Sequence, residues 1–366
     1  MQEARTGTAL IRATREYAKD DPSRSLFHVI STGLALVAAF LVAALGGEPW
    51  LRILGGVAAG LITVRAFIIY HDHQHHAILR DSKIIEGVMQ LFGILVLAPS
   101  QVWKQTHNHH HTHNARLHGS HIGSFEVLTV GAWDRASFPR KLGYYMMRHP
   151  MTILAGYLTV FVGGFCVSPL MRNFKKHFDS LIALLVHIGL YVLVVNTAGW
   201  FAAICTITIP FSVASALGAY LFYIQHNFVG VRYLARDEWT YAEAACDSSS
   251  YLKAGPVLRW ITGNIGFHHI HHLNPLIPFY KLPVVMREVP ELSNPIETSL
   301  HPREIYACLR LDLWSTAKGR MVSYREARRE RREAAAAAVA SHDSVSTTES
   351  TVVKTAFGST AAQEAS

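Results

Sequence analysis

Residues 51–76 read LRILGGVAAGLITVRAFIIYHDHQHH, an apolar run that passes directly into a cluster of histidines. A helix of roughly 20 apolar residues is long enough to cross a bilayer core, and Leu51 to Tyr70 meets that length. Arg65 lies close to the end of the run, where its side chain can reach a headgroup region or a polar domain. The junction therefore predicts a membrane helix that presents imidazoles at one end.

Composition supports a membrane protein. Of the 366 residues, 50% are hydrophobic and only 16% are charged, which disfavours a soluble globular domain. Lysine and arginine outnumber aspartate and glutamate by 34 to 26, and many of these basic residues flank apolar runs. That placement is typical of a cytoplasmic face next to anionic lipid rather than of nucleic-acid binding. The four cysteines are far apart, which argues against a disulfide framework or a thiolate-held metal.

Two hairpins are expected in the membrane. Leu26 to Leu45 is long enough to span and would pair with Leu51 to Tyr70. Ser180 to Gln225 carries no formal charge, and its length suits two crossings joined by a turn near Asn196 to Trp200.

Two other apolar segments are not expected to cross. Gly87 to Pro99 is too short to span, which favours an interfacial or re-entrant helix. Met151 to Met171 has positive residues on both sides, so we expect it to dip into the membrane and return. The predicted fold is an all-α integral membrane protein with about four transmembrane helices in two hairpins, re-entrant or interfacial helices, and a cytoplasmic His-rich cap.

Three domains are predicted along the chain. Residues 1–24 form a cytoplasmic lead-in, and residues 25–315 form the membrane domain. Residues 316–366 comprise a basic helix and a tail of small and polar residues, for which we expect disorder after about Ala340.

Histidine spacing predicts a metal centre. In each of three clusters the histidines recur at i, i+3 or i+4, so that on a helix they share one face. Nine imidazoles are enough for two metal ions with four or five nitrogens each. Imidazole suits zinc, copper, nickel and iron alike, so the ligand type alone does not name the metal. The candidate ligands are His71, His75, His107, His110, His111, His226, His268, His271 and His272.

Which histidines within each cluster bind the metal is not decided by the sequence. His109 with His113, or His269 with His272, are alternative pairs that spacing does not exclude. A ligating imidazole also needs an acceptor that orients its second nitrogen. The predicted residues for that role are Asp72, Asn108, Asn227 and Asn264.

The set of clusters resembles the membrane fatty acid desaturases. Their motif HDxxH matches HDHQH at 71–75, and HxxHH matches both HNHHH at 107–111 and HHIHH at 268–272, with WKxxHN leading into the second. The stretches LFYIQHNF and SSYLKAGPVLRWITGNIGFHHIHHLNPLIPFYKL are similar to the bacterial acyl-lipid branch of that family. The resemblance covers about Leu26 to Leu313.

This resemblance implies an enzyme that introduces a double bond into a long acyl chain, with O₂, two electrons and two non-haem irons held by the nine histidines. It implies an acyl lipid substrate, a bacterial inner membrane with a cytoplasmic active site, and a separate electron donor of the ferredoxin or cytochrome b5 type. One position departs from the family pattern. Animal acyl-CoA desaturases hold an iron-bound water with an asparagine four residues before the histidine that corresponds to His226, and here that position is Phe222.

Two alternatives remain open. A membrane diiron hydroxylase or ketolase of lipids or carotenoids would use the same kind of centre. A non-catalytic metal-binding membrane protein is the second alternative, although a transporter would place its ligands near the bilayer midplane. Here the histidines lie at the predicted ends of the spans.

Overall fold

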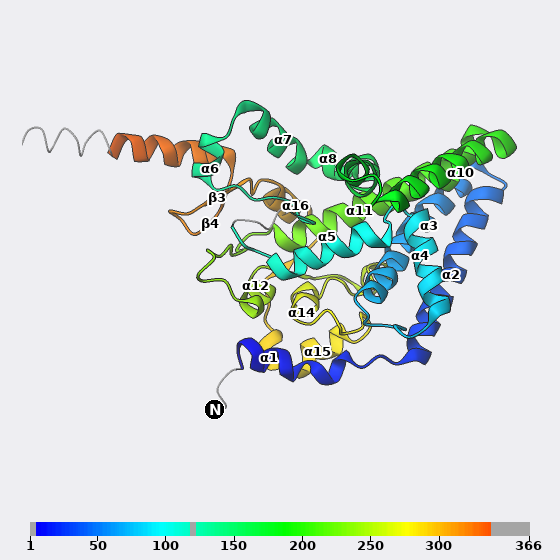
Figure 1. Cartoon of the computed structure of the whole chain (residues 1–366), viewed down its shortest axis with the longest axis horizontal. Helices are drawn as coiled ribbons and strands as arrows, with labels where there is room; N and C mark the ends of the chain where they lie inside the picture. Colours follow the sequence, from blue (N-terminus) through cyan, green and yellow to red (C-terminus); the bar gives the residue numbers. More distant parts are fainter. Residues whose placement is uncertain (1–4, 118–121, 338–366) are drawn as a thin grey trace, which may run out of the picture. The chain divides into compact units, whose positions relative to one another are not determined.

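The computed structural model describes residues 5–117 and 122–337. Most of the described chain is helical, with two short pairs of strands (Figure 1). Internal contacts divide the chain into residues 1–321 and residues 322–366. In the second unit, residues 324–337 are helical. The predicted domain boundaries at residues 24 and 315 stay predictions, and the tail predicted to be disordered lies outside the described residues.

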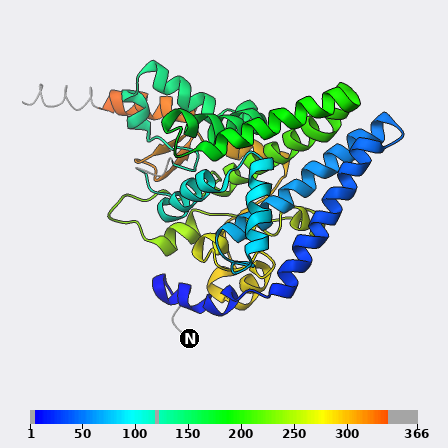
Figure 2. The ribbon, with the colours of Figure 1, turned by 45° about the vertical axis from the view of Figure 1, so that its right-hand side comes forward.

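The first predicted hairpin is present. Helix α2 (Pro22–Leu45) begins where the Asp21 carboxylate accepts hydrogen bonds from the N–H groups of Ser23 and Arg24, both at 3.1 Å. Pro22 fits this first helical position because its ring fixes φ and the missing N–H costs nothing there. After a short turn, α3 (Pro49–Gln74) runs back beside α2 (Figures 1 and 2).

The second predicted hairpin consists of α10 (Phe178–Ala203), η3 (Ile204–Thr208) and α11 (Ile209–His226). At about 1.5 Å per residue, one straight helix over these 49 residues would be about 74 Å long, more than twice the bilayer core. Gly199 interrupts the helix with φ 81°, a conformation that glycine adopts without strain. This break lies within the predicted turn, and α10 and α11 lie side by side in Figure 2.

The apolar side chains of these helices face outward. Three segments are long and apolar enough to cross a membrane, or four if the bent pair α4–α5 is counted as one span. Only 11% of the most apolar stretch of α2 is buried, and 17% of that between Phe178 and His226. Apolar surface of this extent has no stabilising contact in water and is typical of lipid-facing helices. The structure thus agrees with the predicted all-α membrane fold.

The short segments follow the expectations in one case and differ in the other. Helix α4 (Lys83–Leu95) has 13 residues and meets α5 (Ser100–His113) at 90°, as expected for a helix too short to span. The segment Met151 to Met171, in contrast, does not dip and return. It forms α8 (Pro150–Leu154), η2 (Tyr157–Val167) and α9 (Ser168–Arg172).

The physical reason for this difference is packing, because η2 lies against α10 and α11. Gly163 and Gly164, which could have formed a tight turn, stay within the π-helix η2. The segment therefore continues into α9 without reversing. At Tyr157–Arg172 it remains an apolar helix shorter than a span.

The remaining elements surround the ends of the two hairpins. Ile270 of α14 packs in one core with Tyr70 of α3 and Trp103 of α5, so three of the four histidine-bearing elements share one hydrophobic core. The end of α11 packs in a second core, through Tyr223 and Ile224. Strand β1 (Tyr251–Leu252) pairs in parallel with β2 (Glu297–Thr298), and β3 (Leu313–Ser315) pairs with β4 (Arg320–Val322). The other helices are α1 (Gly7–Ala13), η1 (Arg15–Ala18), α6 (Val130–Arg135), α7 (Phe138–Arg148), α12 (Tyr241–Asp247), α13 (Pro256–Ile261), α14 (His268–Leu273), α15 (Leu282–Glu288), η4 (Pro290–Leu292) and α16 (Pro302–Leu309).

Small residues allow α3 to pack closely against the second hairpin. A Cβ atom added at Gly56 would lie 2.4 Å from the carbonyl oxygen of Cys205, and one at Gly60 would lie 2.8 Å from that of Pro210. Both contacts are with backbone, which cannot move aside as a flexible side chain can. The spacing of the two glycines is the small-xxx-small pattern of closely packed membrane helices.

We predict that Gly56→Ala destabilises the protein, because the added methyl group overpacks this contact at a cost of about 1–3 kcal/mol. Gly87→Ala is the matched control, since a Cβ at this exposed position of α4 has no neighbouring atom within 4 Å. The measurement is the melting temperature of each purified variant in detergent. Equal melting temperatures for the two variants would contradict the proposed helix contact.

Candidate metal centre

Four segments far apart in the sequence meet at one place. The last turn of α3 carries His71, and His75 follows as its C-terminal cap. Helix α5 carries the second histidine cluster and α14 carries the third, while His226 is the last residue of α11. All nine predicted ligands lie in one of two groups in which the candidate ligand atoms are within 4.8 Å of one another. The structure therefore brings the whole predicted set together.

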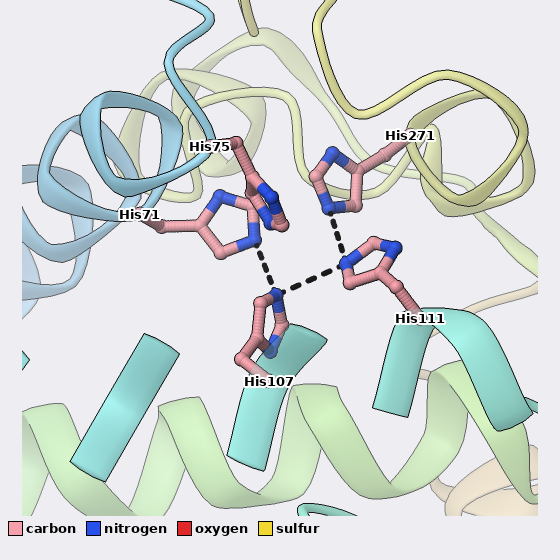
Figure 3. Close-up of side chains that lie close together, drawn as sticks. All are labelled: His71, His75, His107, His111 and His271. Carbon is pink, nitrogen blue, oxygen red and sulfur yellow. Dashed lines mark hydrogen bonds between the residues drawn. The ribbon is translucent and has the colours of Figure 1, made fainter. Parts of the chain in front are cut away.

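The first group contains five imidazoles from three segments (Figure 3). The Nε2 atoms of His71 and His107 are 3.0 Å apart, and those of His107 and His111 are 3.1 Å apart. The Nε2 atom of His271 lies 3.2 Å from that of His111. The members are His71, His75, His107, His111 and His271.

The second group contains four imidazoles whose Nε2 atoms form a closed ring. Its successive distances are 3.0 Å from His110 to His226, 2.9 Å from His226 to His268, 3.1 Å from His268 to His272, and 3.2 Å from His272 back to His110. Because they form a ring, all four nitrogens face a common centre.

These distances fit bound metal ions. With metal–nitrogen bonds of about 2.1 Å, adjacent ligands at a right angle lie about 3.0 Å apart, close to the spacings in both groups. The donor set, imidazole without thiolate, suits iron, zinc, copper or nickel. Burial, together with the neighbouring imidazoles, lowers the pKa of His271 and His272 well below the usual 6.5. Both rings are therefore neutral at pH 7 and keep a lone pair for a metal.

Each group has one imidazole whose ligating nitrogen is fixed by a hydrogen bond. The Nδ1 atom of His71 donates to the Asp72 carboxylate at 3.0 Å, and that of His226 donates to the carbonyl oxygen of Ser248 at 3.1 Å. These oxygens only accept, so the proton lies on Nδ1 and the lone pair lies on Nε2, which faces its group. This is the usual arrangement of a metal-binding histidine.

Asp72 and Asn264 both form hydrogen bonds with the backbone of Phe279. The second oxygen of the Asp72 carboxylate accepts from the N–H of Phe279 at 2.6 Å. The amide of Asn264 donates to the carbonyl oxygen of the same Phe279 at 3.2 Å. Asn264 therefore supports the metal centre by holding the segment that orients Asp72, and not by contacting an imidazole itself.

Asn108 and Asn227 lie elsewhere than predicted. Asn108 is on the exposed side of α5, because it is one residue from His107 and points away from that face. The side-chain oxygen of Asn227 accepts from the buried Arg148 at 2.7 Å, and its amide donates to the carbonyl oxygen of Cys308 at 2.8 Å. Asn227 thus joins α11 to α7 and α16 and is engaged away from the imidazoles.

Three histidines of the alternative ligand pairs, His109, His113 and His269, lie outside both groups. The rings of His109 and His113 stack on each other with centroids 3.9 Å apart, and neither belongs to a group. The Nε2 atom of His269 lies 3.1 Å from the carbonyl oxygen of Leu292, to which it can donate. This places His269 against η4 and away from the two groups.

Aromatic rings form part of the surroundings of the imidazoles. Trp103 stacks on His107 with centroids 4.2 Å apart, as its position four residues earlier on α5 allows. The ring of Phe222 lies 4.9 Å from that of His110, so the position where the animal enzymes have asparagine does face the second group. Gln225, the residue before His226, donates from its amide to the carbonyl oxygen of Ile265 at 3.0 Å.

Sequence reasoning missed the carbonyl oxygen of Ser248 and the N–H of Phe279. Both are backbone groups, whose roles depend on the fold and not on the side chain, so no sequence signal could have found them. The role of Trp103 could have been found from its i−4 spacing to His107.

An all-α membrane fold with two buried groups of histidines, each of which could hold a metal ion, defines a membrane protein with a polyhistidine centre. Residues 48–303 match the family model described as fatty acid desaturase, and this range includes every histidine of both groups. The match covers more than half of the chain, so the protein belongs to the fatty acid desaturase family.

Individual relatives agree with this assignment. A fatty acid desaturase of Bacillus subtilis is 28% identical over 326 residues, which are 86% of this chain and 90% of the relative. An omega-3 fatty acid desaturase of Glycine max is 26% identical over 75% of this chain and 61% of its own. A Delta(12)-fatty-acid desaturase of Arabidopsis thaliana is 22% identical over 60% of this chain and 61% of its own.

Two groups of imidazoles predict two metal ions per chain. We expect His110→Ala to lose the ion of the second group, because the ring of four nitrogens would be opened. His109→Ala should keep both ions, since His109 lies on the same helix but outside the groups. Metal analysis of protein purified from iron-supplemented cells measures this. The same loss of metal in both variants would contradict the assignment of two metal-binding groups.

Proposed function

We propose that this protein is a fatty acid desaturase that uses O₂, two electrons and two non-haem irons to form a C=C bond in a long acyl chain. The observation that carries the proposal is the convergence of nine imidazoles in two groups inside a membrane protein of the desaturase family. Five imidazoles would hold one iron and four would hold the other.

The overall reaction balances without further co-reactants. Two adjacent methylene groups each lose one hydrogen, and O₂, two electrons and two protons complete the formation of two waters. Removing hydrogen from an unactivated methylene is beyond the acid–base chemistry of side chains. The iron pair, when bound, would supply the oxidising power for this step.

The protein's own residues prepare the site in three ways. Burial keeps His271 and His272 neutral, so each retains a lone pair that can bind a metal ion. Asp72 and the carbonyl oxygen of Ser248 fix which nitrogen of His71 and His226 ligates. Imidazole is also more resistant to oxidation than a thiolate would be, and no cysteine belongs to either group. Phe222 adds an apolar wall beside His110, where the bound methylenes would be shielded from water.

The distribution of positive charge supports a cytoplasmic active site. Arg12, Arg15 and Lys19 precede the start of α2, and the antiparallel hairpin returns the histidine end of α3 to the same level. Positive residues mark the cytoplasmic side. We therefore propose a bacterial inner membrane protein that receives its electrons from a separate donor of the ferredoxin or cytochrome b5 type.

The decisive test is the fatty acid composition of a host that lacks the product. We predict a new monounsaturated or polyunsaturated chain with the wild-type protein, and no product with His272→Ala. His109→Ala should retain activity, and immunoblots of the membrane fraction establish equal insertion. Mass spectrometry distinguishes loss of two hydrogens from the gain of oxygen that a hydroxylase or ketolase would cause. Oxygenated product, or activity in His272→Ala, would contradict the proposal.

A further inference from the structure

A second polar site lies apart from the imidazole groups, where the start of α2, the middle of α3 and α13 meet. It is a pocket of about 450 Å³. Its polar lining is dominated by nitrogen donors, with Arg24, His28, Arg65, Arg259 and Trp260 among its residues. No aspartate or glutamate lines it.

Arg65 forms the inner wall of this pocket. Its relative exposure is only 3%. Each of its three guanidinium nitrogens donates a hydrogen bond to an uncharged group. Nε donates to the Thr32 hydroxyl at 3.0 Å, and Nη1 donates to the carbonyl oxygen of Trp260 at 2.6 Å. Its guanidinium also lies over the Trp260 ring, 4.5 Å from the centroid. Among the described residues no carboxylate neutralises this buried cation.

The tautomer of His28 adds another donor. Nη2 of Arg65 donates to Nδ1 of His28 at 3.1 Å, and a guanidinium can only donate. The proton of a neutral His28 must therefore lie on Nε2. That Nε2 atom is buried and has no hydrogen-bond partner in the described chain, so a donor beside the pocket is left unpaired.

Two further arginines complete the site. Arg259 donates from Nη2 to the Tyr251 hydroxyl at 2.7 Å, while its buried Nε has no partner among the described residues. Arg24 lies over the ring of Tyr280 at 4.5 Å. Three guanidinium groups thus line one pocket, and none forms an ion pair with a described residue.

Two carboxylates beside the start of α2, Asp20 and Asp21, accept hydrogen bonds from neutral groups and form no ion pair with the three arginines. Asp21 accepts from the backbone at the start of α2. One oxygen of Asp20 accepts from the hydroxyls of Ser25 and Tyr280, and the other accepts from the N–H of Leu79. Three guanidinium groups outnumber these two carboxylates, so the pocket keeps a net positive charge that favours an anion.

The side chains around the pocket are those expected where a protein meets the surface of a membrane. Phe27 on α2 is 64% exposed, and Val257 on α13 is 71% exposed. Trp260, which forms a wall of the pocket, is also exposed to the surroundings. Exposed tryptophan beside apolar residues at the start of a membrane helix is typical of the boundary between acyl chains and headgroups.

We propose that this pocket binds the phosphate of an anionic glycerophospholipid. A phosphate offers several strong acceptor oxygens, which match arginine donors arranged around a cavity. The lipid's acyl chains would lie against the exposed apolar surface of α2 and α13. The bound phosphate would accept hydrogen bonds from the guanidinium groups that line the pocket.

The pocket also has a structural connection to the metal centre. Phe279 and Asn264 line its wall. These are the residues through which Asp72 is held in place, by the N–H of Phe279 and the amide of Asn264. A bound headgroup would therefore pack against the segment that orients His71.

The test measures lipid binding to the full chain in detergent by native mass spectrometry. Phosphatidylglycerol is the anionic probe, phosphatidylcholine carries the same phosphate with a compensating cation, and inorganic phosphate tests for a free ion. The double variant Arg24→Gln/Arg259→Gln removes two donors that are not deeply buried. Lys83→Gln is the charge-matched control, because Lys83 is 92% exposed on α4 and lies outside the pocket.

We expect the double variant to bind phosphatidylglycerol about tenfold or more weakly, as loss of charge-assisted hydrogen bonds predicts, and Lys83→Gln to bind it like the wild type. Arg24→Lys/Arg259→Lys should restore part of the affinity. Unchanged binding in the double variant overturns the proposal, as does equal affinity for phosphatidylcholine or for inorganic phosphate. If the double variant unfolds, Arg24→Gln alone gives the same test at an exposed position. None of these results depends on desaturase activity.

Discussion

The fold depends on one electrostatic constraint: nine imidazoles are buried in two groups whose candidate ligand atoms lie within 4.8 Å of one another. Buried polar atoms are costly unless they have partners, and lone pairs that face one another repel. A cation at the centre of each group removes both costs at once. This requirement explains why α3 and α11 end at the same level, why α5 turns 90° away from α4, and why the short α14 is fully buried between them.

Both the packing of the membrane helices and individual backbone groups position the imidazoles. Glycines on α3 let the two hairpins approach closely, which fixes the positions of His71 and His226. The peptide groups of Ser248 and Phe279 then select the proton positions, directly for His226 and through Asp72 for His71. The family motifs contain the histidines, but the lone-pair directions of His71 and His226 also depend on backbone groups outside the motifs, those of Phe279 and Ser248.

Much of this arrangement was predictable because it follows from local patterns. Apolar length gave both hairpins, glycine allowed the turn at Gly199, and i, i+3, i+4 spacing gave the histidine faces. The rest depends on tertiary contacts. Spacing alone could not choose between His268 and His269, because the choice is made by the carbonyl oxygen of Leu292. Asn227 looked equally suitable beside His226, yet the buried Arg148 engages it. The straight path of residues 157–172 likewise depends on packing against α10 and α11.

X-ray absorption at the iron edge tests the central claim most directly, because it reports the atoms bonded to the metal in the purified, iron-loaded protein. The account predicts a first shell of nitrogen and oxygen at about 2.1 Å, with the outer-shell scattering of imidazole rings and no sulfur. A sulfur shell, or iron without imidazole scattering, would contradict it.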